Sequence, residues 1–179
     1  METNLYTITV LPMMKTLESF SGILDTAIAH AEKRGADWYP GTKRMEDLLQ
    51  SRLVFDQFQL VHQIQVACDN AKNGTSRIAA IEVPKFEDNE KTGPEVKERL
   101  EKTIAYLKTI KPEQLNGREE SRVEVPYHPK MTLSAFEYAT LYLMPNFYFH
   151  IVTAYSIIRK NGVEIGKSDL LNHLPWKTQ

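Results

Sequence analysis

The sequence predicts an all-α fold, a four-helix bundle with one long crossover. Residues 138–158 contain no Asp, Glu, Lys or Arg, a composition typical of the central helix of a bundle. Residues 10–34 and 56–74 repeat apolar side chains at steps of three and four, the spacing of amphipathic helices. Residues 94–111 place apolar side chains on one face and charged ones on the other, which predicts the remaining long helix.

Length and composition limit the class of protein. A chain of 179 residues with 42% hydrophobic and 25% charged residues suits one globular domain, residues 1–179. A net charge of −1 offers no attraction for a phosphate backbone, which disfavours nucleic-acid binding. The single Cys68 cannot form an intramolecular disulfide, and the start of the chain lacks the basic and apolar regions of a signal peptide. We therefore expect a cytoplasmic protein.

Turn and cap residues mark the ends of the first helices. Pro12 fits the first turn of the first helix, and Gly35 is a natural residue just beyond its end. Pro40 and Gly41 predict a turn, and a short helix is expected over residues 43–50.

The second long helix carries polar residues close to its apolar face. We expect this helix to begin near Asp56 and to end at Gly74 or a few residues later. On a helical wheel its apolar face is defined by Val61, Ile64 and Cys68. Polar residues inside this face or at its edge are Gln65, His62 and Asp69, and those on the opposite side, expected to be solvated, are Gln59, Gln63 and Asn70.

The connections before and after the third long helix are also predicted. Residues 82–94 read as a loop, with Thr92 or Gly93 as the helix cap, and Pro112 stops the helix at its other end. Val123 and Val125 alternate with polar neighbours, which predicts a small β-hairpin before the last helix.

The last helix has the length of a membrane span but not the composition of one. Ser134 and Glu137 match a capping box at its start. Its apolar stretch is interrupted by polar residues, which would be costly against lipid: Thr140, Asn146, His150, Thr153 and Ser156. We therefore predict a core helix and no membrane span.

His150 occupies the centre of the most buried stripe of this helix. An inward imidazole can be a metal ligand, a proton carrier or a core histidine with one hydrogen-bond partner. By residue type Asp69 is the expected partner, because a carboxylate can orient an imidazole or complete a metal shell. The candidate metal ligands are His150, Asp69, Gln65 and His62. In the alternative, a structural network is formed by His150, Asn146 and Asp69.

Three segments carry a family resemblance: FDQFQLVHQIQVACDNAK, IAAIEVPKFEDNEKT and LMPNFYFHIVTAYSIIRKNGVEIGKSDLL. They resemble an uncharacterised helical family within the DinB/YfiT-like superfamily, over roughly residues 53–171. The resemblance implies an up-down-type four-helix bundle with a long crossover, frequently assembled as a homodimer. It also implies a divalent metal, zinc or nickel, held by three histidines, one from the second helix and two from the last. Some relatives are metal-dependent thiol transferases or isomerases.

Carried onto this sequence, the three-histidine pattern is incomplete. His150 matches the histidine that follows PNFYF. The second-helix position falls near Gln65, with His62 one turn away, and residues 140–142 lack the remaining histidine. Two hypotheses follow. One is an enzyme, a metal-dependent thiol transferase or a hydrolase-like protein acting on a small molecule; the other is a non-catalytic dimeric or small-ligand-binding bundle.

Overall fold

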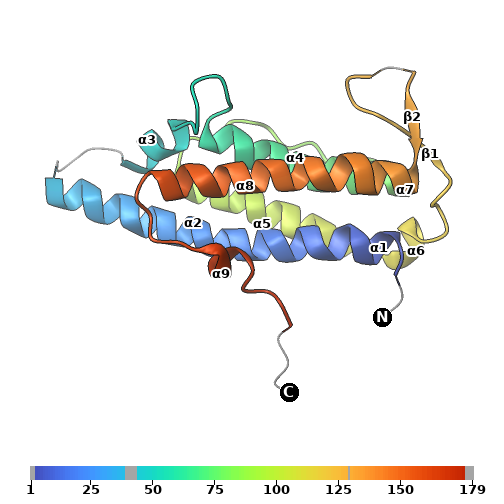
Figure 1. Ribbon diagram of the computed structural model, residues 1–179, viewed down its shortest axis with the longest axis horizontal. Helices are drawn as coiled ribbons and strands as arrows, with labels where there is room; N and C mark the ends of the chain where they lie inside the picture. The colour runs from blue at the N-terminus through green and yellow to red at the C-terminus, as the bar shows by residue number, and fades with distance from the viewer. Residues whose placement is uncertain (1–2, 39–43, 129, 176–179) are drawn as a thin grey trace.

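The computed structural model describes residues 3–38, 44–128 and 130–175. Within these residues, four long helices lie side by side as a bundle (Figure 1): α2 (Val10–Trp38), α4 (Leu60–Ala79), α5 (Gly93–Thr109) and α8 (Met144–Lys160). Short helices connect or flank them: α1 (Leu5–Ile8), α3 (Arg44–Gln50), α6 (Pro112–Leu115), α7 (Ala135–Glu137) and α9 (Lys167–Leu170). The all-α prediction is confirmed.

A small hairpin stands at one end of the bundle (Figure 1). Its strands, β1 (Arg122–Glu124) and β2 (Thr132–Ser134), pair antiparallel with Val123 opposite Leu133. The predicted hairpin before the last helix is thereby confirmed. Ser134 ends β2 and also caps α7, because Glu137 N donates to Ser134 Oγ while Ser134 N donates to the Glu137 carboxylate.

The connection between α4 and α5 is the long crossover, residues 80–92, and it runs back along the bundle (Figure 1). As a result α4 and α5 point the same way. Asp69 contacts Arg99, and Ser76 contacts Tyr106 about two turns further along both helices. Thr92, one of the two predicted cap residues, caps α5 and forms a capping box with Glu95.

Some predicted helix ends are wrong. α2 continues through Gly35 to Trp38, so this glycine does not end the helix. α4 begins at Leu60, after the Gln59 cap, rather than near Asp56. The short helix α1, capped by Asn4, was not predicted. The turn at residues 40–41 lies outside the described residues.

The last helix is not a regular α-helix along its whole length. Residues Tyr138–Leu143 form a π-helix, η1, that leads directly into α8 and Pro145. Proline has no N–H to donate to the carbonyl four residues earlier, and a wider turn accommodates this loss. The wider turn also rotates the preceding residues. Phe136, which a regular helix would place near the His150 stripe, is therefore exposed.

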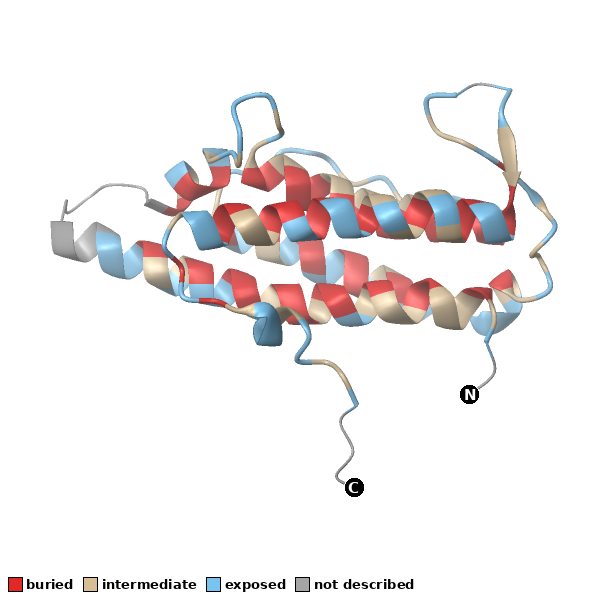
Figure 2. Cartoon of the chain, viewed as in Figure 1, coloured by how far each residue is buried: buried red, intermediate tan, exposed pale blue. Residues whose placement is uncertain are grey.

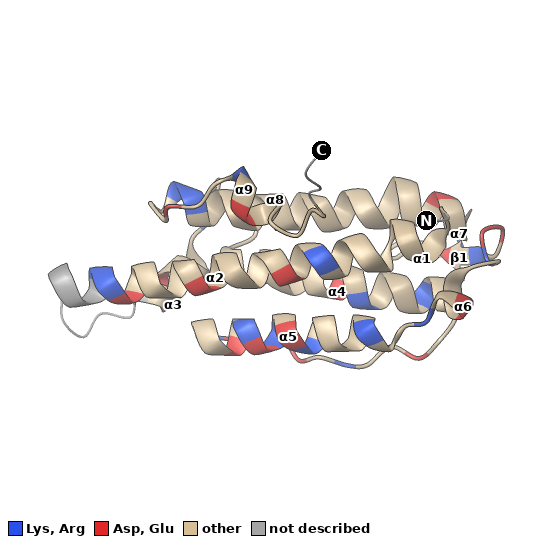
Figure 3. Ribbon diagram, turned by 90° about the horizontal axis from the view of Figure 1, so that it is seen from below, with Lys and Arg blue, Asp and Glu red and all other residues tan. Residues whose placement is uncertain are grey.

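The core lies between the facing sides of the long helices (Figure 2). α4 is packed on two sides, against α8 and against α5. The outer face of α5 carries alternating acidic and basic residues, whereas α8 stays free of charge as far as Ile158 (Figure 3). Among the described helices, none is long and apolar enough to span a membrane.

Candidate functional site

His150 on α8 and Gln63 on α4 form the polar contact between these two helices. The imidazole Nδ1 lies 2.6 Å from Gln63 Oε1, and both residues are buried. The prediction that Gln63 is solvated is therefore wrong. A helical wheel with one apolar face assumes that only one side of the helix is covered, but α4 is covered by α5 on one side and by α8 on the other.

The hydrogen bonds of Gln63 assign the tautomer of His150. The amide Nε2 of Gln63 donates to the backbone carbonyl of Phe58 at 3.2 Å, so the amide oxygen is the atom that faces the imidazole. An oxygen only accepts, so Nδ1 of His150 carries the proton and donates. In the neutral ring the lone pair then belongs to Nε2.

Nε2 of His150 is left available. Among the described residues it has no hydrogen-bond partner, and it is not one of the fully buried polar atoms that lack a partner. The side chain as a whole is 8% exposed. The imidazole is thus held by Gln63 through one nitrogen and keeps the other as an unpaired acceptor.

The surroundings of this imidazole are aromatic and uncharged. Phe149 meets His150 edge to face at 5.3 Å between ring centroids, and Phe58 stacks on His62 at 4.1 Å. Burial lowers the pKa of His150, and the neighbouring His62 lowers it further. Within the described part of the chain, no carboxylate, lysine or arginine contributes to this shift. Both effects favour the neutral form of His150.

Gln65 and Asp69, the other two predicted site residues, lie in a different network. Gln65 Nε2 donates to Glu90 Oε2 at 2.8 Å, and Asp69 Oδ1 accepts from Arg99 Nη2 at 3.0 Å. Both contacts are on the side of α4 that faces α5 and the crossover. The structure brings His62 to His150 but keeps Gln65 and Asp69 away from it.

Arg99 is the centre of this second network. Its side chain is 2% exposed and forms ion pairs with Glu90 at 2.9 Å and Asp88 at 2.8 Å, in addition to Asp69. It also donates to the carbonyl of Glu87 at 3.1 Å. Burial alone would raise the pKa of Glu90, but hydrogen bonds from Gln65 and Arg99 hold it below its usual value.

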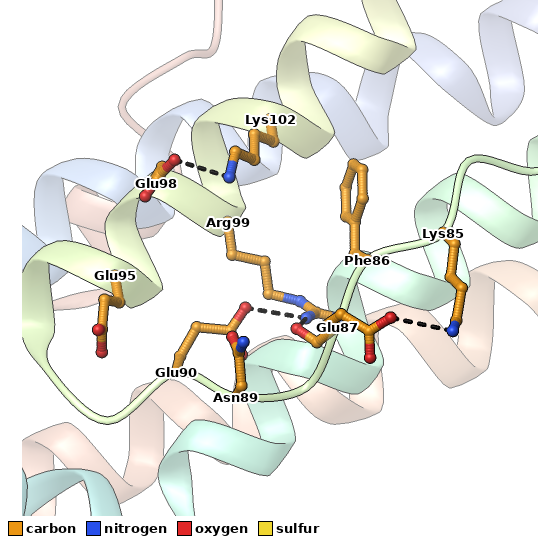
Figure 4. Close-up of a pocket in the computed structure, with 9 residues that line it drawn as sticks. All are labelled: Lys85, Phe86, Glu87, Asn89, Glu90, Glu95, Glu98, Arg99 and Lys102. Atoms are coloured by element: carbon orange, nitrogen blue, oxygen red, sulfur yellow. Dashed lines mark hydrogen bonds and ion pairs between the residues drawn. The ribbon is translucent and has the colours of Figure 1, made fainter.

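A cavity of about 540 Å³ lies between the crossover and α5 beside this network (Figure 4). Most of its charged lining is paired within the lining itself: Lys85 with Glu87, Lys102 with Glu98, and Arg99 with Glu90. Glu95 is engaged in the capping box of α5, where it accepts from the backbone N–H groups of Lys91 and Thr92. The cavity therefore offers a ligand little unsatisfied charge.

Comparisons with known proteins identify the family. The model of a domain of unknown function, DUF1993, matches residues 5–171. The chain belongs to the DUF1993 family. A crystal structure of a DinB family member protein from Shewanella denitrificans is similar to it, with 37% identity and a TM-score of 0.88 over 98% of this chain and 96% of that chain. The DinB-like resemblance is thereby confirmed. Among curated proteins, none matches this chain.

The donor set of this DUF1993 protein does not fit a resident zinc or nickel ion. Catalytic zinc sites use three protein ligands, and glutamine is a poor ligand for either metal. Around His150 the chain offers one further imidazole, His62, and the amide of Gln63. Among the residues that the structure describes, no three His, Cys, Asp or Glu side chains are grouped to hold a metal.

Cys68 of the DUF1993 chain borders the Arg99 network but is not a candidate nucleophile. It is fully buried, and burial raises the pKa of its thiol to about 11. A protonated, inaccessible thiol is a poor nucleophile.

Two important residues of the DUF1993 chain were missed from the sequence. Gln63 was placed on the solvent side, and Arg99 was read as part of a charged helix face. The available signal for Arg99 was its position next to the inward Val96 and Leu100, with the acidic segment EDNE close by.

Proposed function

We propose that this DUF1993 protein is a small-ligand-binding bundle in which the His150 imidazole is the binding group and no metal is resident. One observation carries the proposal: Nδ1 of His150 is fixed by Gln63, while Nε2 has no hydrogen-bond partner among the described residues. A group held in one orientation before binding loses little entropy when a ligand arrives.

The superfamily implies a second possibility, a metal-dependent thiol transferase or hydrolase-like activity. Such chemistry needs an electrophilic group beside the base, and in relatives a metal held by three histidines supplies it. The His150, His62 and Gln63 set supports binding of a small molecule better than it supports that activity.

Metal analysis and nitrogen NMR test the proposal together. Tag-free protein should contain far less than one equivalent of zinc or nickel, and His150→Ala should leave that content unchanged. In ¹⁵N-labelled protein at neutral pH, His150 should show a protonated Nδ1 and an unprotonated Nε2. Near-stoichiometric metal that disappears in His150→Ala would overturn the proposal and favour the enzyme.

We also propose that the protein forms a homodimer through the uncharged side of α8. Large apolar side chains are exposed on or just before this helix: Leu141, Tyr148 and Val152. A surface without charge can face its own copy across a two-fold axis without like-charge repulsion. Light scattering should give a dimeric mass for the wild type and a monomeric mass for Val152→Glu, and a monomeric wild type would contradict this.

A further inference from the structure

The orientation of His150 restricts what a ligand must supply. Its Nδ1–H is used by Gln63, and the amide of Gln63 cannot turn over without losing the Phe58 carbonyl. Only the Nε2 lone pair remains, and it is an acceptor. A ligand that pairs with this atom must donate an O–H or N–H group.

The electrostatics around His150 restrict the charge of the ligand. No charged residue occurs between Tyr138 and Ile158, and the charged residues of α4 nearest in sequence, Asp69 and Lys72, are ion-paired on the side facing the crossover. The segment before α4 carries two exposed charged residues, Arg52 and Asp56; Arg52 donates to Gln57 and Gln59, and neither residue contributes to the electrostatics of His150. A charged ligand would lose hydration here without gaining an opposite charge. The surroundings therefore favour an uncharged molecule.

Two half-exposed rings restrict the shape of the ligand. Phe149 is 54% exposed while it contacts the His150 ring, and Phe58 is 48% exposed while it stacks on His62. Both are phenylalanines with open surface close to the imidazoles. An aromatic ligand would cover this surface and gain ring contacts in addition to apolar burial.

Together these features define a class of ligand. Resting on the proposed binding role of His150, we propose that this site takes uncharged aromatic molecules that carry one hydrogen-bond donor, of which a phenol is the simplest. The hydroxyl donates to His150 Nε2, and the ring packs against Phe149 and Phe58.

Fluorine NMR with three probes tests the class. We expect 4-fluorophenol to bind with a Kd on the order of 1 mM, since so small a ligand gains little free energy. 4-Fluoroanisole, in which a methyl group replaces the donated proton, should bind about tenfold more weakly because one hydrogen bond is lost. 4-Fluorobenzoate tests the charge requirement and should bind no better than the anisole.

Variants locate the binding site. His150→Gln and Phe149→Leu should each weaken 4-fluorophenol, while Lys102→Met, on the far helix α5, should leave it unchanged. The ¹⁵N spectrum of His150 reports on the same sample. If addition of 4-fluorophenol perturbs Nε2 and not Nδ1, the proposed contact is supported.

Failure of the proposed function and failure of the proposed ligand class give different results. A His150 ring protonated on Nε2, or bound to a metal, would overturn the proposed function itself. The proposed ligand class is wrong if the tautomer is as assigned but the anisole or the benzoate binds as tightly as the phenol. It is also wrong if the phenol does not bind up to a concentration about tenfold above the expected Kd. In both cases the binding role of His150 stands.

Discussion

Gly74 on α4 lies directly against Leu143 on η1, with no room for a side chain between them. A Cβ added to Gly74 would be 2.3 Å from Leu143 Cδ1 and 3.1 Å from its Cγ. Leu143 is 1% exposed and has little free space to move into. This contact and the His150–Gln63 hydrogen bond both join the last helical segment to α4.

Gly74→Ala should destabilise the protein by about 1–3 kcal/mol, because the new methyl group overpacks the α4–η1 contact. Gly22→Ala is the matched control: Gly22 is also inside a helix, but nothing lies within 4 Å of its added Cβ. There alanine should stabilise by about 0.5–1 kcal/mol. Urea unfolding measures both. Equal effects in the two variants would argue against the close packing, and adding Leu143→Ala should weaken the Gly74→Ala penalty.

Arg99→Met should cost about 3–5 kcal/mol of unfolding free energy, because it leaves the buried carboxylate of Glu90 without its cation. Lys102→Met removes a lysine from the same helix, but its pair with Glu98 is exposed, so that variant should change stability by less than about 1 kcal/mol.

The ion pair of Glu90 should also make stability depend on acid pH. The pKa of Glu90 is lowered in the folded protein, so the ionised carboxylate stabilises the fold above the usual pKa of 4.5. This stabilisation is lost as the pH falls through the lower pKa of the folded state. Arg99→Met should therefore lose part of the acid dependence of stability, and an unchanged acid limb would contradict this.

Stability should fall as the pH drops below about 6.5, in part because of His150. The pKa of His150 is lowered in the folded state by burial and by His62, so the unfolded chain takes up this proton first. At pH values above the pKa of the unfolded chain, His150 is neutral in the folded and the unfolded state and has no effect on the pH dependence of stability. Replacing it in His150→Gln should reduce the slope by no more than about 1.4 kcal/mol per pH unit, the limit for one proton. Urea unfolding at several pH values measures the slope, and an identical slope in the variant would show that His150 titrates normally.

Cys68 should resist alkylation by iodoacetamide at pH 8 in the folded protein and react readily in urea. Its pKa of about 11 leaves almost no thiolate at this pH, and the sulfur is buried. Mass spectrometry after timed labelling gives both rates. Comparable rates in the two states would mean that the α4–α5 interface opens easily.

The sequence was sufficient for the long helices and several caps because these depend on local patterns, such as the Thr92–Glu95 and Ser134–Glu137 boxes. It was insufficient for the site because neighbours far away in the chain decide which polar face of a helix is covered. Gln63 is buried by α8, and Asp69 is taken up by Arg99 on the opposite side. The π-helix before Pro145 could not be located from apolar spacing, since one wider turn changes the direction of all residues before it.

The crossover has an irregular backbone, yet buried cations hold it. Lys72 Nζ donates to the carbonyl of Pro84 at 2.7 Å, and Arg99 donates to the carbonyl of Glu87. Proteases need a stretch of chain that can detach and enter their active site. Lys85 lies between these two anchors and is well exposed, but detaching its segment would cost Lys72 and Arg99 the buried carbonyls to which they donate. Trypsin should therefore cut here only as fast as the bundle itself unfolds, so the longest irregular connection in the described chain is a poor place to nick the native protein.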